Sequence, residues 1–175
     1  MKIEVIDNFL TSYHRDSYAN MFGGMTKEGA ALFPWYFINN LNGEERLGNF
    51  YFNYTLIESF RVYNQEGLHF FNPILSKLNV SIDRVSRLKV NLYPWTSRRI
   101  HHKSHSDYDP GQNLTTCLYY VNTSNRVTIF DGKKKIRCKG NRAIIFDGSI
   151  KHHSTTPTDT NYGISINIDY REKDL

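Results

Sequence analysis

The stretch SHSDY at residues 104–108 decides how this chain is interpreted, because it sets His105 two positions before Asp107. Residues i and i+2 of an extended strand point to the same side, so these side chains are predicted to share one face. A second histidine pair, His152-His153, follows later in the chain. Two histidines and one carboxylate suit non-haem Fe(II), because this set leaves coordination positions open. The alternative is a surface histidine beside a turn aspartate, since so short a motif recurs by chance.

Four runs rich in β-branched and aromatic residues follow this motif and predict strands. They are residues 114–122, 125–130, 143–148 and 164–170. The second run ends at Asp131-Gly132, a strong hairpin signal, and the last alternates apolar and polar residues like a half-buried strand. His152 comes between the third and fourth runs. This order predicts a mainly β fold with flanking helices, a double-stranded β-helix (jelly roll, cupin-like) with a metal at its mouth.

The N-terminal half predicts elements that support this core. Strands are expected over residues 2–7, 33–37, 49–56 and 86–93, and a mostly helical segment over residues 64–78. Thr11 or Ser12 can cap a helix that runs to Phe22 and stops at Gly23-Gly24. Pro73 must begin a helix or kink one. The polar, glycine-containing loops 25–32 and 39–48 are either flaps over a substrate or plain connections.

Length and composition fit one globular domain. The 175 residues are 39% hydrophobic and 14% aromatic, which suits a β protein with a sizeable core. No apolar run approaches a membrane span, and the N-terminus lacks the apolar region of a signal peptide. We therefore expect no membrane partner. Cys117 and Cys138 provide no disulfide framework, so we expect a reducing, cytoplasmic setting.

The net charge of +5 comes largely from two basic clusters. Residues 133–139 follow the predicted hairpin turn and indicate a solvated hairpin tip. Arg98, Arg99 and Lys103 precede the metal motif. They would flank the mouth of the site and attract an acidic substrate or nucleic acid, or they are simply solvated.

Several ordered motifs resemble those of the 2-oxoglutarate- and Fe(II)-dependent oxygenase superfamily, in its prolyl 4-hydroxylase-like branch. The matching segments are VIDNFL (5–10), FPWY (33–36), RLKVNLYP (87–94), HSD (105–107), YYVNT (119–123), FDGSIKH (146–152) and TDTN (158–161). Members from phage and marine bacteria look closest. The resemblance implies one oxygenase-like jelly-roll domain over residues 1–175, with supporting elements in 1–83 and the metal-binding core in 84–170. It places the protein in the cytoplasm of a bacterium or of an infected host cell.

The resemblance also implies the ligands of the metal. They are His105, Asp107 and His152, which would bind Fe(II) through two neutral imidazoles and one carboxylate oxygen. His152 is preferred over His153 because the interval from Phe146 matches the family. His153 would face away if the backbone is extended.

The cosubstrate residues follow from the same resemblance. Tyr120 matches the tyrosine that bonds a carboxylate of 2-oxoglutarate, and Tyr93 matches a second tyrosine on the cosubstrate side. Core aromatic packing is the alternative for both. His101 and His102 are expected to be loop histidines rather than ligands. The implied activity uses Fe(II), O2 and 2-oxoglutarate to hydroxylate an unidentified small molecule or peptide, with release of succinate and carbon dioxide.

One position departs from the family pattern. The family carries a basic residue, usually arginine, on the final strand, where it pairs with the far carboxylate of 2-oxoglutarate. This chain has Gly163 there. The sequence favours weak 2-oxoglutarate binding that Gly163→Arg would strengthen. Arg126 is a possible substitute, although Val127 competes for the inward position, and Arg142 is a second candidate.

Gly163 therefore keeps two other functions open. One is a vestigial metal-binding jelly roll, and the other is a cupin-type metalloenzyme that does not use 2-oxoglutarate. Asp107 argues against a halogenase, which needs that carboxylate position vacant for chloride. Nucleic acid stays an unfavoured partner, because the final strand lacks the second arginine of demethylating relatives.

Overall fold

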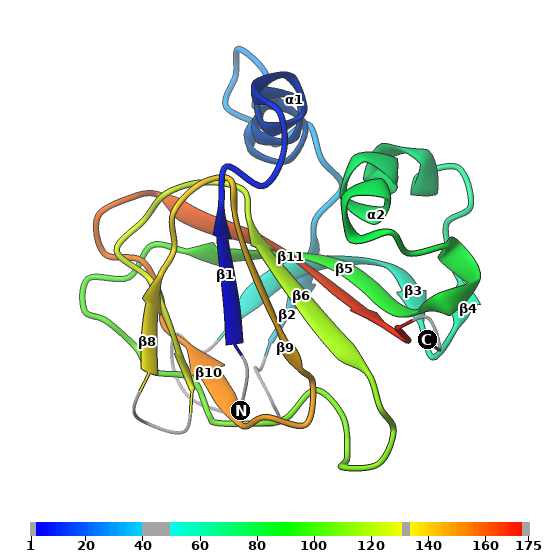
Figure 1. Cartoon of the computed structure of the whole chain (residues 1–175). Helices are drawn as coiled ribbons and strands as arrows, with labels where there is room; N and C mark the ends of the chain where they lie inside the picture. Colours follow the sequence, from blue (N-terminus) through cyan, green and yellow to red (C-terminus); the bar gives the residue numbers. More distant parts are fainter. Residues whose placement is uncertain (1–2, 40–49, 131–133, 173–175) are drawn as a thin grey trace.

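The computed structural model describes residues 3–39, 50–130 and 134–172, and its strands dominate the view in Figure 1. The strands are β1 Ile3–Asp7, β2 Tyr36–Ile38, β3 Tyr51–Glu58, β4 Arg61–Val62, β5 Val85–Pro94, β6 Thr115–Tyr120, β7 Val127–Phe130, β8 Lys134–Arg137, β9 Arg142–Asp147, β10 His152–Ser154 and β11 Tyr162–Tyr170. The helices are α1 Ser12–Gly23 and α2 Asn72–Leu78, with short 3-10 turns at Leu68–Phe71 and Ile82–Arg84.

The strands form two antiparallel sheets. The main sheet has the order β1-β9-β6-β11-β5-β3-β2, with β4 paired to β3, and the smaller sheet has the order β10-β7-β8. Helices α1 and α2 lie on one side of the main sheet, and the smaller sheet lies on the other side (Figure 1). The predicted jelly roll of mainly β structure is confirmed.

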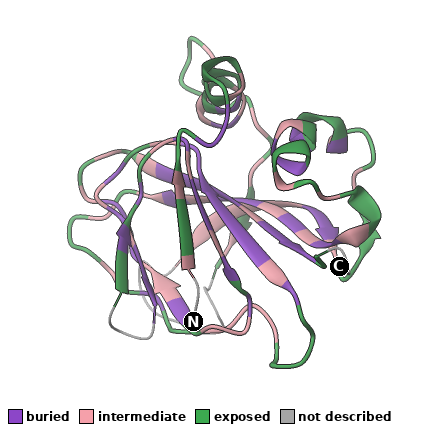
Figure 2. Cartoon of the chain, viewed as in Figure 1, coloured by how far each residue is buried: buried purple, intermediate pink, exposed green. Residues whose placement is uncertain are grey.

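Strand β11 is buried on both faces rather than half-buried as its alternation predicted (Figure 2). Its isoleucines, Ile164, Ile166 and Ile168, pack in the core beneath the helices. Its polar residues point the other way, where Ser165 lines a pocket and Asp169 is fully buried. The alternation was therefore correct, but the polar face borders an internal site because β11 lies between β5 and β6.

The N-terminal elements were mostly predicted. Thr11 caps α1 by accepting a hydrogen bond from the backbone N–H of His14. Pro73 lies in the first turn of α2, where its missing N–H costs nothing. The segment at residues 64–78 is mostly helical, as predicted: the 3-10 turn at Leu68–Phe71 leads into α2, and before it Asn64 accepts from Gly67 N–H in a turn.

The strand predicted over residues 33–37 begins only at Tyr36. Pro34 has no N–H to pair, and Trp35 N–H donates to the carbonyl of Phe33 in a local turn. Phe33 and Trp35 instead pack against the core under the helices. Strands β1 and β3 do more than support the core, because they pair with β9 and β5 and so belong to the main sheet.

Two loop predictions are settled in part. A bridge between Met25 and Ala31 closes the loop at residues 25–32 as a small hairpin, whereas residues 40–48 of the second loop lie outside the described part of the chain. Over its described residues 134–139, the basic cluster belongs to a hairpin and is solvated, as predicted, but Lys134–Arg137 lies along strand β8, paired to β7, with its basic side chains exposed. The turn at Asp131-Gly132 and Lys133 lie outside the described residues.

Cys117 and Cys138 are both buried and free of disulfides. Among the described residues, no helix has the length and apolar character needed to span a membrane.

Candidate functional site

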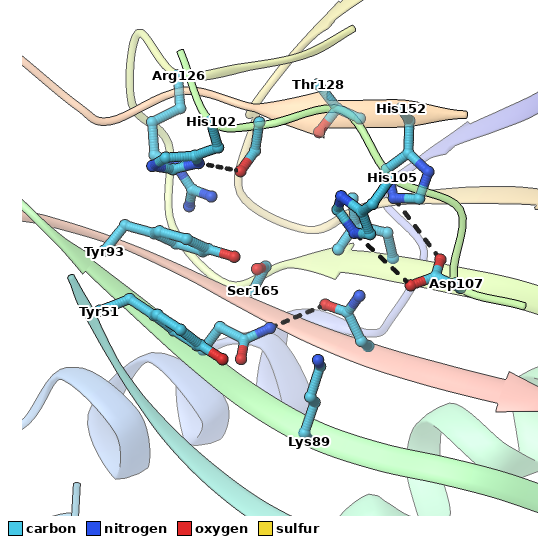
Figure 3. Close-up of a pocket in the computed structure, with 14 residues that line it drawn as sticks. Tyr51, Lys89, Tyr93, His102, His105, Asp107, Arg126, Thr128, His152 and Ser165 are labelled. Carbon is cyan, nitrogen blue, oxygen red and sulfur yellow. Dashed lines mark hydrogen bonds and ion pairs between the residues drawn. The ribbon is translucent and has the colours of Figure 1, made fainter. Parts of the chain in front are cut away.

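The three predicted metal ligands meet at one end of the space between the two sheets (Figure 3). His105 lies in the segment between β5 and β6, and His152 begins β10. The backbone N–H of each donates to the carbonyl of the other, at 3.0 and 2.8 Å, which sets the imidazole centroids 4.7 Å apart. Asp107 N–H donates to the carbonyl of Gly148 at 2.8 Å. One ligand atom from each of the three residues lies within 4.8 Å of the others.

The imidazoles are oriented for metal binding. Nδ1 of His152 contacts the carbonyl of Ile150 at 2.9 Å, and Nδ1 of His105 contacts that of Lys103 at 3.4 Å. A carbonyl only accepts, so each Nδ1 is the donor, and in the neutral tautomer that this selects Nε2 carries the lone pair. These lone pairs belong to the atoms that face Asp107, with His152 Nε2 at 3.6 Å from its carboxylate. Such outer contacts fix the tautomer of a metal-ligating histidine.

The protonation states also suit a divalent cation. Burial, together with the neighbouring His152, lowers the pKa of His105 to about 4, so its ring is neutral at pH 7. Burial alone would raise the pKa of Asp107. Arg87 and the two histidines outweigh that effect and hold it below its ordinary value, so the carboxylate stays ionised.

Arg87 supports the metal ligands from behind. Its guanidinium forms ion pairs with both Asp107 and Asp169. Thr116 Oγ1 lies 2.6 Å from the Asp169 carboxylate and 3.2 Å from that of Asp107. Burial raises the pKa of Asp169 to about 6 even beside Arg87. The sequence prediction missed this network, although Arg87 lies in a family-like segment and Asp169 on the polar face of the final strand.

Arg126 points into the pocket and occupies the space beside Gly163. The arginine is 2% exposed, and a Cβ built on Gly163 would lie 2.4 Å from its Cδ. Its Nε donates to the carbonyl of Thr155 at 3.0 Å, and the guanidinium carbon lies 4.0 Å from the ring centroid of Tyr93. Buried Nη1 has no hydrogen-bond partner in the described chain. An arginine at position 163 would collide with Arg126, so this geometry does not support the expectation that Gly163→Arg strengthens binding.

Arg142 does not reach this space. Its guanidinium pairs with Asp7 on the outside of the main sheet, with Nε 2.6 Å from the carboxylate. That pairing holds the pKa of Asp7 well below its usual range. Val127 is likewise absent from the residues that line the pocket. The inward position therefore belongs to Arg126.

The two predicted tyrosines have different places. Tyr93 lines the pocket and stacks between Tyr51 and His102, with ring centroids 5.7 and 5.3 Å away. Tyr120 does not line the pocket. Its hydroxyl lies 2.6 Å from Thr128 Oγ1, and Thr128 is the residue that faces the pocket. A direct contact from Tyr120 to a ligand therefore has Thr128 in its way.

His102 lies in a loop and outside the three-ligand group, as predicted, but it also lines the pocket, which the sequence did not indicate. Its Nδ1 lies 2.9 Å from Ser154 Oγ, and burial together with the nearby Arg126 lowers its pKa to about 3. His101 instead meets His153, with Nδ1 and Nε2 3.5 Å apart. His153 thus faces away from the three ligands, as expected from its position next to His152.

No protein-family model matches the sequence, and no curated protein matches it. Solved structures do share its fold. A prolyl hydroxylase from Trichoplax adhaerens, in complex with a hypoxia inducible factor peptide fragment, is 16% identical with a TM-score of 0.59, over 97% of this chain and 83% of that one. A viral collagen prolyl hydroxylase from Paramecium Bursaria Chlorella virus-1 is 16% identical with a TM-score of 0.56, over 99% and 91%. The epimerase SnoN of nogalamycin biosynthesis, a non-haem α-ketoglutarate-dependent enzyme, is 8% identical with a TM-score of 0.64, over 97% and 77%. The chain therefore shares the jelly-roll fold of these enzymes. At these identities the likeness concerns the fold and not the reaction.

Proposed function

We propose that this chain is a 2-oxoglutarate- and Fe(II)-dependent dioxygenase that hydroxylates an unidentified substrate. The observation that carries the proposal is one pocket that holds both a three-ligand set and a buried arginine without a carboxylate partner. A metal site alone would fit many jelly rolls. A guanidinium whose Nη1 has no hydrogen-bond partner among the described residues adds a place for the far carboxylate of the oxo acid.

The donor set fits Fe(II). His105 and His152 would hold the metal through Nε2, and Asp107 through one carboxylate oxygen. When bound, Fe(II) would supply oxygen activation, coupled to conversion of 2-oxoglutarate to succinate and carbon dioxide. Arg87 keeps the Asp107 carboxylate ionised and oriented, and the two backbone carbonyls hold the imidazole lone pairs toward the metal.

Arg126 takes the part of the basic residue that the family carries at position 163. Its Nε is fixed by the carbonyl of Thr155, and its plane lies against Tyr93, which leaves the Nη atoms for a ligand. Tyr120 acts through Thr128 by holding the hydroxyl that faces the pocket. This arrangement removes the main reason for the vestigial alternative, which was the missing base.

The substrate is a small molecule or a peptide. A peptide finds support in the Trichoplax neighbour, whose structure contains one. We also propose that residues 1–175 are one domain, because strands from both halves complete the main sheet. Free buried thiols at Cys117 and Cys138 fit a reducing compartment such as the cytoplasm.

The direct test is conversion of 2-oxoglutarate to succinate by the Fe(II)-loaded protein under oxygen, without added substrate. We expect slow succinate formation by the wild type and none by Asp107→Ala. His153→Ala is the matched control and should behave as the wild type, because its ring faces His101. If the wild type binds metal but forms no succinate and does not bind 2-oxoglutarate, a cupin-type metalloenzyme replaces this proposal.

A further inference from the structure

Lys89 is a charged residue of the pocket to which the proposed chemistry gives no task. It lies in the middle of β5, where it pairs with Asn167 of β11 and Thr55 of β3. The neighbours at 88 and 90 on β5 are buried in the core under the helices, so Lys89 points the other way. Figure 3 shows its amine rising into the pocket from the main sheet, below the three metal ligands.

No ion pair or hydrogen bond joins the ammonium of Lys89 to another described residue, and the side chain is half-buried. The two carboxylates near it, Asp107 and Asp169, already pair with Arg87. Burial and the neighbouring Arg87 lower the pKa of Lys89 to about 8, so it still carries its charge at pH 7. A partly desolvated ammonium without a paired anion is stabilised when a ligand supplies one.

The pocket thus holds two cations that form no ion pair with a carboxylate of the described residues, and they lie apart. Arg126 lies beside Tyr93 and His102, whereas Lys89 lies on the main sheet near Asp107 (Figure 3). Arg87 is paired with Asp107 and Asp169, so neither carboxylate forms an ion pair with Lys89. A ligand with one carboxylate can meet only one of the two free cations. A ligand with two carboxylates can meet both.

We propose that Lys89 binds a carboxylate at the metal end of the pocket while Arg126 binds a second carboxylate, so that the pocket selects dicarboxylates over monocarboxylates. This inference rests on the proposed function for the identity of the natural ligand, a 2-oxo dicarboxylate. The selectivity itself comes from protein charges and does not need the metal. Lys89 is therefore a specificity-determining residue.

The test uses glutarate, a five-carbon dicarboxylate without a keto group, and the full chain freed of metal with a chelator. Without metal or keto group, only the protein cations hold the ligand. We expect calorimetry to show that Lys89→Met, which keeps the length and removes the charge, weakens glutarate binding at least about tenfold. Lys89→Arg should retain binding. Lys77→Met, an exposed lysine on α2, is the matched control and should bind as the wild type.

Two outcomes overturn the inference. One is equal glutarate affinity in the wild type and Lys89→Met. The other is a wild type that binds glutarate no better than pentanoate, its monocarboxylate counterpart, at up to roughly 10 mM. Thermal melting of each variant checks that it is folded. If glutarate selectivity depends on Lys89 but Fe(II)-loaded protein forms no succinate, the oxygenase proposal fails and the dicarboxylate pocket stands.

Discussion

The two ends of the pocket are built in opposite ways. At the metal end, every candidate ligand is held by the chain itself: a backbone bridge joins His105 to His152, and Arg87 holds Asp107. At the anion end, Arg126 has one backbone contact through Nε, and its buried Nη1 has no partner in the described part of the chain. The first end is organised before any ligand arrives. The anion end has a hydrogen-bond donor that no described residue uses, which indicates that its partner is a ligand.

Asp107→Ala should produce the largest effect, a loss of metal affinity at the metal end, and should leave Arg126 at the anion end in place. Loss of the one anionic ligand is expected to lower the affinity for Mn(II), a stand-in for Fe(II), by more than about a hundredfold, since even outer contacts are worth 10–100-fold. Metal titration followed by calorimetry measures this. His152→Ala should do the same, and His153→Ala should not. Equal loss in the His153 variant would mean that the wrong histidine has been chosen.

Arg126→Met should break only the anion end. We expect the Mn(II)-loaded protein, kept anaerobic, to lose about 30-fold or more in 2-oxoglutarate affinity, because two charge-assisted hydrogen bonds of roughly 1.5–3 kcal/mol each disappear. Mn(II) affinity should stay unchanged. Arg142→Met controls for the loss of an arginine, since that side chain pairs with Asp7 outside the pocket. An unaltered 2-oxoglutarate affinity in Arg126→Met would place the far carboxylate elsewhere.

Gly163→Ala sharpens the comparison by crowding the anion end without changing a charge. The added methyl would lie 2.4 Å from Arg126 Cδ, so we expect the free energy of unfolding to fall by about 1–3 kcal/mol. Urea unfolding measures the change. The same substitution in an Arg126→Ala background should cost little, because the colliding side chain is gone. Equal costs in both backgrounds would show that Arg126 does not occupy this space.

The smallest effect concerns pH. The pKa of Lys89 is lowered to about 8, so its positive charge is present at pH 7 and is lost as pH rises through 8. Dicarboxylate affinity of the wild type should therefore fall between pH 7 and pH 9, by at most about tenfold. In Lys89→Met the affinity should be flat over this range. A parallel decline in both proteins would assign the titration to another group.

The metal end could be predicted from the sequence because short motifs carry it. The spacing of His105 and Asp107 and the family-like interval from Phe146 indicated the three residues, although the two lie in a loop rather than on the expected strand, where only His105 forms a bridge, to His152. The succession of strands along the chain also follows from local alternation and turns. The strand predicted over residues 33–37 starts late because a local turn competes with alternation. The hydrogen bond from Trp35 N–H to the carbonyl of Phe33 forms that turn, and β2 begins only after it.

The anion end could not be predicted in the same way, because its geometry depends on residues far apart in the sequence. Arg126 turns inward where Gly163 leaves room, and neither residue indicates this by itself. His102 turns inward because the segment before the metal motif pairs with β10, where His102 N–H donates to the carbonyl of Ser154. The inward position of Lys89 could have been predicted, because alternation along residues 86–93 puts it on the same face as Tyr93.

The close approach of Arg126 to Gly163 constrains how such a pocket can change by single substitutions. An ancestor with arginine at 163 that first gained arginine at 126 would hold two guanidinium groups in a volume that fits one. An ancestor that first lost arginine at 163 would pass through a form with no anchor for the far carboxylate. Either order passes through an intermediate that binds the far carboxylate poorly, so positions 126 and 163 are expected to change together. A search that requires arginine at position 163 would therefore miss chains of this type.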